Sequence, residues 1–257
     1  MASRTANAGA LTYAITLGTV LLIGFAGFAL GTLLALVSVG VLGVIGINVL
    51  DRPVLQIVIS VVTLQGLGFG SVALFYLTTR EDGFSLLRVS MPGLRDLAWI
   101  VGGLVALFLA LIGVNLVQTT FGIESADHGL VELGAQNPEL LLVLVPLSIL
   151  LVGPGEELLF RGIIQQLLAN RFGVALGIGI ASVIFAVAHV GALTGEGMLA
   201  TLVTYVVLSI ILGVSYEYSD NLVVPAVIHG LFNAIQFLLL YWVITTGGEE
   251  MLAFLLL

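Results

Sequence analysis

The 257-residue chain contains no cysteine and no lysine. Without cysteine there can be no disulfide bond, thiolate nucleophile or cysteine-ligated metal site. Its seven basic residues are all arginines and face fifteen acidic residues, so the formal net charge is −8. Nucleic-acid binding needs a basic patch, and we therefore expect no nucleic-acid partner. An acidic, lysine-free surface suits high salt and predicts a halophilic microbe as the source; a chance bias among few charged residues is the alternative.

Charge of either sign is scarce. Only 9% of the residues are charged, 60% are hydrophobic and the mean hydropathy is +1.22, whereas an ordinary soluble domain is about 25% charged. Apolar runs of about 20 residues are long enough to cross the hydrocarbon core as helices. The composition therefore predicts an all-α polytopic protein, a multi-pass protein of the cell membrane in contact with the lipid bilayer.

The apolar runs predict about eight transmembrane helices in a single integral membrane domain over residues 1–257. The uncharged stretch 11–50 is too long for one crossing, and Gly31-Thr32 is the expected fold point between two helices. The first 30 residues are expected to be a retained helix, not a signal peptide, because no cleavage-site pattern follows them. The other expected spans lie near 53–77, 97–118, 140–152, 174–190, 198–216 and 222–245, with 154–172 as an additional amphipathic or half-buried helix.

Arginine positions predict an orientation. The positive-inside rule places arginine-bearing segments in the cytoplasm, and the acidic loop 124–139 then lies outside. With eight spans both termini would also lie outside, which leaves Arg4 and Arg52 on the wrong side. The arginines that define the cytoplasmic side are Arg80, Arg88, Arg95, Arg161 and Arg171.

A first motif, residues 156–161, reads Glu-Glu-Leu-Leu-Phe-Arg between apolar flanks. Ionisable groups at membrane depth are expensive and mark function by default. Positions four apart share a helix face, so Glu157 and Arg161 are predicted to pair. Glu156 points about 100° away and is predicted to stay free. It lies near the start of its helix, where the dipole favours the carboxylate, and is the candidate general base.

Two further motifs carry histidines. His189 ends the span 174–190, with Phe185 one turn back on the same face, and His229 and Asn233 project side by side from the last span. A histidine at the membrane–water boundary is the alternative for His189, and hydrogen bonds that tie helices together are the alternative for His229 and Asn233. The third histidine, His128, lies in the acidic loop and is expected to be only solvated.

Together these residues match the needs of a hydrolase. Glu156, assisted by His189, would take a proton from water, and His229 with Asn233 would donate hydrogen bonds to a tetrahedral intermediate. The serines of the spans lie in no serine-hydrolase signature. Glu156, His189 and His229 also offer a ligand set for zinc with water in the open position. The chain lacks the pattern H-E-x-x-H, so zinc stays an open alternative.

The motifs E-E-x-x-x-R, F-x-x-x-H and H-x-x-x-N occur in this order at 156–161, 185–189 and 229–233. In these residues the chain resembles the CPBP family of intramembrane proteases, which includes type II CAAX prenyl endopeptidases and bacteriocin-processing or immunity proteins. The resemblance predicts a CPBP-like catalytic core over 136–245. Residues 1–135 are N-terminal helices without a motif.

The resemblance implies Glu156 as the catalytic glutamate, His189 as its partner, and His229 with Asn233 as the oxyanion site. Glu157 and Arg161 would orient the helix that carries the first motif (the motif helix), and Phe185 would pack beside the site. It also implies an all-helical core around an intramembrane catalytic cavity that opens to the membrane and to one aqueous face. Family members are often labelled metalloproteases, but the motifs fit metal-free glutamate chemistry equally well. The implied substrate is a membrane-associated peptide or protein, with lipidated chains included.

The leading prediction is an intramembrane endopeptidase that cleaves near the membrane surface, with CAAX-type C-terminal processing as one form. One rival is a non-catalytic membrane scaffold or a bacteriocin-immunity-type protein. The other is a proton-coupled transporter, because intramembrane glutamate and histidine also build proton relays. Against a transporter, the polar groups cluster in the C-terminal half, and no matching pair of broken helices is found in the two halves.

Overall fold

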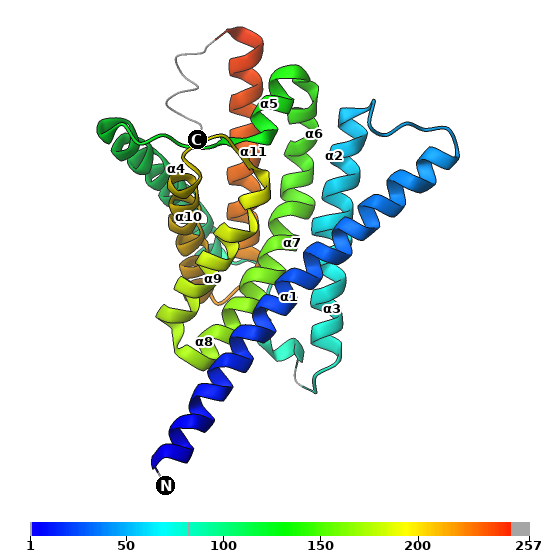
Figure 1. Cartoon of the computed structure of the whole chain (residues 1–257). Coiled ribbons are helices and arrows are strands. Elements are labelled where there is room, and N and C mark those ends of the chain that lie inside the picture. Colours follow the sequence, from blue (N-terminus) through cyan, green and yellow to red (C-terminus); the bar gives the residue numbers. More distant parts are fainter. Residues whose placement is uncertain (1, 82, 248–257) are drawn as a thin grey trace.

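A computed structural model describes residues 2–81 and 83–247 of the chain, and these residues are helical almost throughout (Figure 1). The all-α polytopic membrane fold is thereby confirmed. Within the described residues, seven helical spans are long and apolar enough to cross a membrane: Leu11–Val44, Pro53–Thr78, Leu94–Phe121, Glu139–Phe172, Val174–Ala192, Met198–Ser219 and Val223–Thr246.

Several of these spans consist of more than one helical element. The π-helices are η1, η3 and η4, the 3₁₀-helices are η2 and η5, and the two short strands pair antiparallel. In chain order the elements are α1 (Ala2–Val44), α2 (Pro53–Val61), η1 (Val62–Phe69), α3 (Gly70–Thr78), η2 (Gly83–Leu86), α4 (Leu94–Phe121), β1 (Asp127–His128), α5 (Gly129–Gln136), α6 (Glu139–Leu147), η3 (Ser148–Val152), α7 (Gly153–Glu157), η4 (Leu158–Gln165), α8 (Gln166–Phe172), α9 (Val174–Ala188), η5 (Val190–Ala192), β2 (Leu193–Thr194), α10 (Met198–Ser219) and α11 (Val223–Thr246).

The first uncharged stretch forms one helix, α1, so the prediction of two helices that meet at Gly31-Thr32 was wrong. Figure 1 shows α1 running obliquely across the bundle, and a tilted helix accommodates an apolar run longer than the bilayer is thick. Gly31 lies within α1 and forms a close helix–helix contact instead of a turn. A Cβ atom at this position would lie 2.7 Å from the Cα atom of Leu64, so its absence lets α1 lie directly against η1.

The fourth span also differs from its prediction. The expected helices 140–152 and 154–172 are one continuous span, Glu139–Phe172, in which π-helices η3 and η4 flank the short α-helix α7. The segment 154–172 was expected to be an amphipathic or half-buried helix, and it includes polar side chains that are almost completely buried, such as Arg161 and Gln165. π-Helical turns occur frequently at functional sites, and here they flank the element that carries Glu156 and Glu157.

An odd number of spans places the start of α1 and the end of α11 at opposite ends of the bundle (Figure 1). The start of α1 and the end of α11 thus do not lie on one side, as the prediction of eight spans required; residues 248–257 lie outside the described residues. Arg4 now belongs, by its position in α1, to the arginine-rich end, which also carries Arg80, Arg88, Arg95 and Arg171. The acidic loop between α4 and α6 lies at the other end, the acidic end, together with Arg52.

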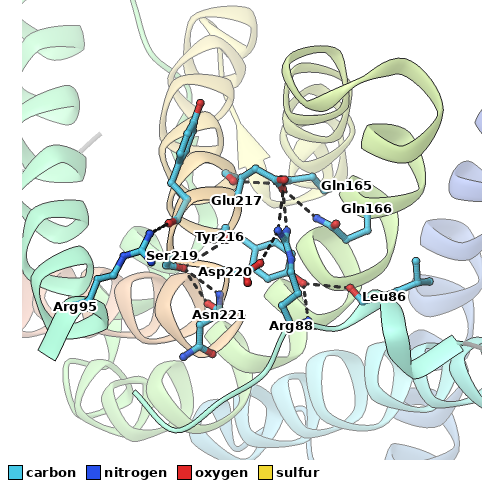
Figure 2. A network of polar contacts seen from close by, with 12 residues as sticks. Leu86, Arg88, Arg95, Gln165, Gln166, Tyr216, Glu217, Ser219, Asp220 and Asn221 are labelled. Atoms are coloured by element: carbon cyan, nitrogen blue, oxygen red, sulfur yellow. Dashed lines mark hydrogen bonds and ion pairs between the residues drawn. The ribbon is translucent and has the colours of Figure 1, made fainter. Parts of the chain in front are cut away.

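A network of polar contacts lies at the arginine-rich end of the bundle (Figure 2). The segment after η2 attaches to the turn between α10 and α11, where Arg88 contacts Glu217 at 2.9 Å and Asp220 at 3.0 Å. The backbone N–H of Leu222 donates to the carbonyl of Arg88, and Asn221 bonds the backbone of Ser90 in both directions. Burial alone would lower the pKa of Arg88, but hydrogen bonds with Glu217 and Tyr216 raise it above its ordinary value. These contacts fix the turn from which α11 starts.

Apolar side chains fill the interior and also cover the outside. Many large ones are exposed on the outer faces, for example Phe25 at 70% and Leu109 at 64%, as expected for helices that face lipid. Inside, a row of aromatic rings runs from α1 to α9 through edge-on contacts of Phe28 with Phe69, Phe69 with Phe160, and Phe160 with Phe185. This row ends at Phe185, beside His189 and His229 of the C-terminal half.

Candidate active site

Close backbone contact brings the first and third motifs together. A Cβ atom at Gly153 would lie 2.5 Å from the carbonyl oxygen of Ala226 and 2.8 Å from the backbone nitrogen of Gly230. A Cβ atom at Gly230 would lie 2.9 Å from the backbone of Ser148 and Ile149. Only glycine allows these two helices to approach so closely, and the approach sets Glu157 opposite His229.

Glu157 is the centre of a buried ionic cluster. Its side chain is fully buried, and its Oε1 atom lies 3.1 Å from Nη1 of Arg161, so the predicted pair at positions four apart is confirmed. The same oxygen lies 2.8 Å from Nδ1 of His229, which can donate to it. This second contact joins residues 72 positions apart and was not predicted. It ties the histidine of α11 to the motif helix.

Arg161 is held on three sides. Its Nη2 atom donates to the backbone carbonyl of Ser209 at 3.2 Å and to the Ser209 hydroxyl at 2.9 Å, both on α10. Its guanidinium lies 4.5 Å from the ring centroid of Phe185, within range of a cation–π contact. The Phe185 ring also contacts the rings of His189 and His229. Phe185 therefore packs beside the site, as the resemblance implied.

Glu156 is oriented differently from Glu157. It is 6% exposed, and its Oε1 atom accepts a hydrogen bond from Nε2 of Gln65 at 3.3 Å. Its Oε2 atom is buried without a hydrogen-bond partner among the described residues. That oxygen faces Nε2 of His189 at 3.9 Å, beyond hydrogen-bond distance. The prediction that Glu156 stays free holds for one oxygen only.

The ring of His189 has an assignable tautomer. Its Nδ1 atom lies 2.8 Å from the carbonyl oxygen of Phe185. Because a carbonyl can only accept, Nδ1 must carry the proton, and in the neutral ring Nε2 is then an acceptor. His189 ends α9, where the helix gives way to η5. Two hydrogen-bond acceptors, Glu156 Oε2 and His189 Nε2, therefore face each other.

These groups line a cavity of about 570 Å³ inside the helix bundle. Its wall includes Glu156, His189, His229 and Asn233, so the structure brings all four sequence-predicted catalytic residues to one space. The remaining wall is largely apolar and includes residues of α1, α4 and α6. The cavity extends toward the acidic end, where Gly191 and Ala192 of η5 form part of its wall.

His128 was expected to be only solvated, but it is half-buried and forms part of the cavity wall. Its Nδ1 atom accepts a hydrogen bond from the backbone N–H of Leu130 and caps α5. Pairing of β1 with β2 places His128 opposite Leu193, just after His189 and η5. Burial, and the charge of His189, lower the pKa of His128 to about 4.

Sequence reasoning missed Gln65 and misjudged His128. Gln65 lies in η1, between apolar residues and outside any motif, and no spacing rule connects it with Glu156. For His128 no local signal existed either, since histidine is not among the residues preferred at a helix N-cap.

The predicted zinc ligands do not form a metal site in this structure. Among the described residues, no group of three or more histidine, aspartate and glutamate side chains is arranged to hold a metal ion. His229 directs Nδ1 to Glu157, while His189 and Glu156 face each other across 3.9 Å. The donor set therefore fits acid–base chemistry better than metal ligation.

Fold and site define a polytopic helical membrane protein with a buried cluster of glutamate, histidine and arginine side chains beside an internal cavity. Residues 138–235 match the family model described as Rce1-like, type II CAAX prenyl endopeptidase Rce1-like. The match covers all three motifs and confirms the resemblance to the CPBP family; at family level it supports a CAAX-type intramembrane endopeptidase. No curated protein and no solved structure matches the chain significantly.

Proposed function

We propose that the protein is an intramembrane endopeptidase that hydrolyses a peptide bond with a water molecule activated by Glu156 and His189. The observation that carries the proposal is the 3.9 Å separation between two acceptors, Glu156 Oε2 and His189 Nε2. A water molecule has two protons and can donate one hydrogen bond to each acceptor, which suits a gap too long for a direct bond. Its oxygen lone pairs then remain directed at a substrate.

In the proposed reaction the water oxygen attacks the scissile carbonyl carbon while Glu156 takes the proton. A tetrahedral intermediate with a negatively charged oxygen results. When the C–N bond breaks, Glu156 returns the proton to the leaving amine. The products are a new carboxylic acid and a new amine, which become carboxylate and ammonium when the acid's proton passes to the amine, so atoms and charges balance without any further reactant.

His229 and Asn233 would stabilise the oxyanion. Two buried carboxylates, Glu156 and Glu157, face one buried guanidinium, that of Arg161. His229 directs Nδ1 at Glu157 Oε1 across 2.8 Å, and an imidazole ring with protons on both nitrogens can donate on both sides. His229 then donates Nδ1–H to Glu157 and keeps Nε2–H for the oxyanion. The Asn233 amide lies in the same cavity wall and supplies the second donor.

The cavity favours a membrane-associated peptide or protein substrate. An apolar wall at membrane depth can hold an apolar or lipidated segment while the polar groups address the peptide backbone. CAAX-type C-terminal processing is the finer assignment that the Rce1-like match suggests. The acidic, lysine-free composition makes high salt the first assay condition.

The test is cleavage of membrane-anchored and lipidated peptides by purified protein in high salt. Glu156→Gln keeps the shape of the side chain but removes the base, and a general base contributes about 10²- to 10⁴-fold. Glu139→Gln is the matched control, since Glu139 is an exposed glutamate that begins the same span. We expect Glu156→Gln to lose cleavage and Glu139→Gln to keep it.

The rivals give different outcomes. If folded wild-type protein cuts nothing and Glu156→Gln still supports the cellular phenotype of the gene, the scaffold hypothesis replaces the protease. If reconstituted wild-type protein instead moves protons across vesicles and Glu156→Gln abolishes that movement, the transporter replaces it.

A further inference from the structure

Glu156 receives its hydrogen bond from a part of the chain that the family match does not cover. Gln65 lies 91 residues before Glu156, in η1, whereas the match begins at residue 138. The donor must be the Nε2 amide, because the Oε1 atom of Gln65 would repel the carboxylate. Residues 1–135, which carry no motif, thus reach the candidate catalytic carboxylate directly.

The N-terminal helices hold Gln65 against Glu156 by close packing on both sides. On one side, a Cβ atom at Gly68 would lie 2.7 Å from the carbonyl oxygen of Gly27, so α1 and η1 meet backbone to backbone. On the other side, a Cβ atom at Gly155 would lie 2.4 Å from the carbonyl oxygen of Gln65 itself. Gly155 immediately precedes Glu156, so η1 is fixed against the motif helix at the position where Gln65 acts.

The hydrogen bonds of Gln65 differ from those of a glutamine that only joins helices. Gln118 uses both ends of its amide: Nε2 donates to Ala200 and Thr204, and Oε1 accepts from Ser125. The Oε1 atom of Gln65 is buried in the cavity wall without a hydrogen-bond partner among the described residues. Its bond to Glu156 is therefore the only polar contact that the described structure gives this amide.

We propose that Gln65 is a positioning residue for Glu156: its amide holds the carboxylate with Oε2 directed at His189 and the attacking water. A hydrogen bond donated to the charged form of a carboxylate favours that form. The bond also uses Oε1, so that Oε2 is the oxygen left for proton transfer. This inference rests on the proposed function, in which Glu156 is the base.

The test compares Gln65→Leu, which removes the donor, with Gln65→Glu, which keeps the shape and replaces the donor by a second carboxylate. For Gln65→Leu we expect kcat to fall about tenfold or more with little change in KM, and the acid limb of the pH–rate profile to move up by about one pH unit. Gln65→Glu should move the limb further, because two neighbouring carboxylates share a proton.

Gln166→Leu is the matched control. Gln166 also donates its amide to a carboxylate, Glu217 Oε2, at 3.4 Å, but in the network of Figure 2 at the arginine-rich end. This control should lose some stability and keep the wild-type pH profile. If the Gln65 variants also keep the wild-type profile and kcat, the inference is wrong, whatever their stability.

A second readout does not need a substrate. The ionisation of Glu156 can be followed by infrared difference spectroscopy of the carboxyl group, with Glu156→Gln as the blank, and in Gln65→Leu it should move to higher pH. If Gln65→Leu does not fold, Gln65→Asn retains the amide but is one methylene too short and should show the same shift. A shift here without any peptidase activity in the wild type would refute the proposed function and leave the role of Gln65 standing; no shift would refute that role.

Discussion

Two polar clusters in this protein use the same residue types in opposite ways. At the arginine-rich end, both carboxylate oxygens of Glu217 accept hydrogen bonds, Oε1 from Arg88 and Oε2 from Arg88 and Gln166. In the cavity, Glu156 accepts one hydrogen bond, from Gln65, and its second oxygen is buried without a partner among the described residues. A saturated carboxylate stabilises a turn, whereas the half-satisfied carboxylate of Glu156 has, in the proposed mechanism, one oxygen left for water.

The two clusters also differ in how far they are removed from water. The side chains of Arg88 and Glu217 are 25% and 17% exposed, while those of Arg161 and Glu157 are 2% and 0% exposed. Solvent screens the first pair and leaves it a modest contribution to stability. The second pair would be costly to break. The comparison therefore predicts which substitutions affect folding and which affect chemistry.

The first prediction concerns which membrane face each cluster is directed to, and its outcome is all or none. The absence of cysteine allows single cysteines at Glu81, near the arginine-rich end, and at Glu124, at the acidic end, both exposed. The positive-inside rule predicts that an impermeant maleimide labels Glu124→Cys in intact cells and Glu81→Cys only after lysis. The reverse labelling would place the acidic end in the cytoplasm.

The second prediction concerns the two arginines. Arg161→Gln leaves Glu157 buried with its main cation removed and should cost about 3–5 kcal/mol of unfolding free energy. Arg88→Gln, at the screened cluster, should cost about 1 kcal/mol or less. Thermal unfolding in detergent measures both. The double substitution Glu157→Gln/Arg161→Gln should recover part of the loss, because it removes both charges; equal losses for the two arginines would contradict the comparison.

The third prediction compares two asparagines: Asn233 of the last span and Asn221 of the turn before it. Asn233→Ala removes a proposed oxyanion donor and should lower kcat about 10²- to 10³-fold with little change in thermal stability. Asn221→Ala removes hydrogen bonds between the turn and Ser90, and should cost about 1–3 kcal/mol of stability while kcat of the folded protein stays unchanged. A kcat loss of similar size in both variants would argue against the oxyanion role.

Local spacing explains what the sequence could predict. The pair of Glu157 and Arg161 follows from helix geometry alone, and five of the seven spans have bounds close to those of a predicted apolar segment. The candidate set Glu156, His189, His229 and Asn233 came from motifs within apolar segments, and folding brings these residues to one cavity.

The missed features depend on contacts between distant segments. The bonds of Glu157 to His229 and of Glu156 to Gln65 join residues 72 and 91 positions apart, and no periodicity encodes them. The continuity of α1 depends on its tilt and on its contact with η1 at Gly31, neither of which an uncharged run reveals. The catalytic roles, unlike the positions, stay predictions until the variants are measured.

The last and smallest effect concerns His128 in the cavity wall. Its pKa is lowered to about 4 by burial and by the charge of His189, below the 6.5 of an ordinary histidine. A lowered histidine pKa gives stability that is fully present above pH 6.5 and is lost as the pH falls through 4. Protonation also removes the Nδ1 acceptor that caps α5.

His128→Asn keeps a capping acceptor but cannot titrate. Between pH 7 and pH 4 the wild type should therefore lose about 1–2 kcal/mol more stability than His128→Asn. Thermal unfolding at both pH values measures this difference, and every other titrating group is common to the two proteins. Equal losses would mean that His128 exchanges protons with solvent as freely in the folded chain as in the unfolded chain, and that the paired strands β1 and β2 do not shield it.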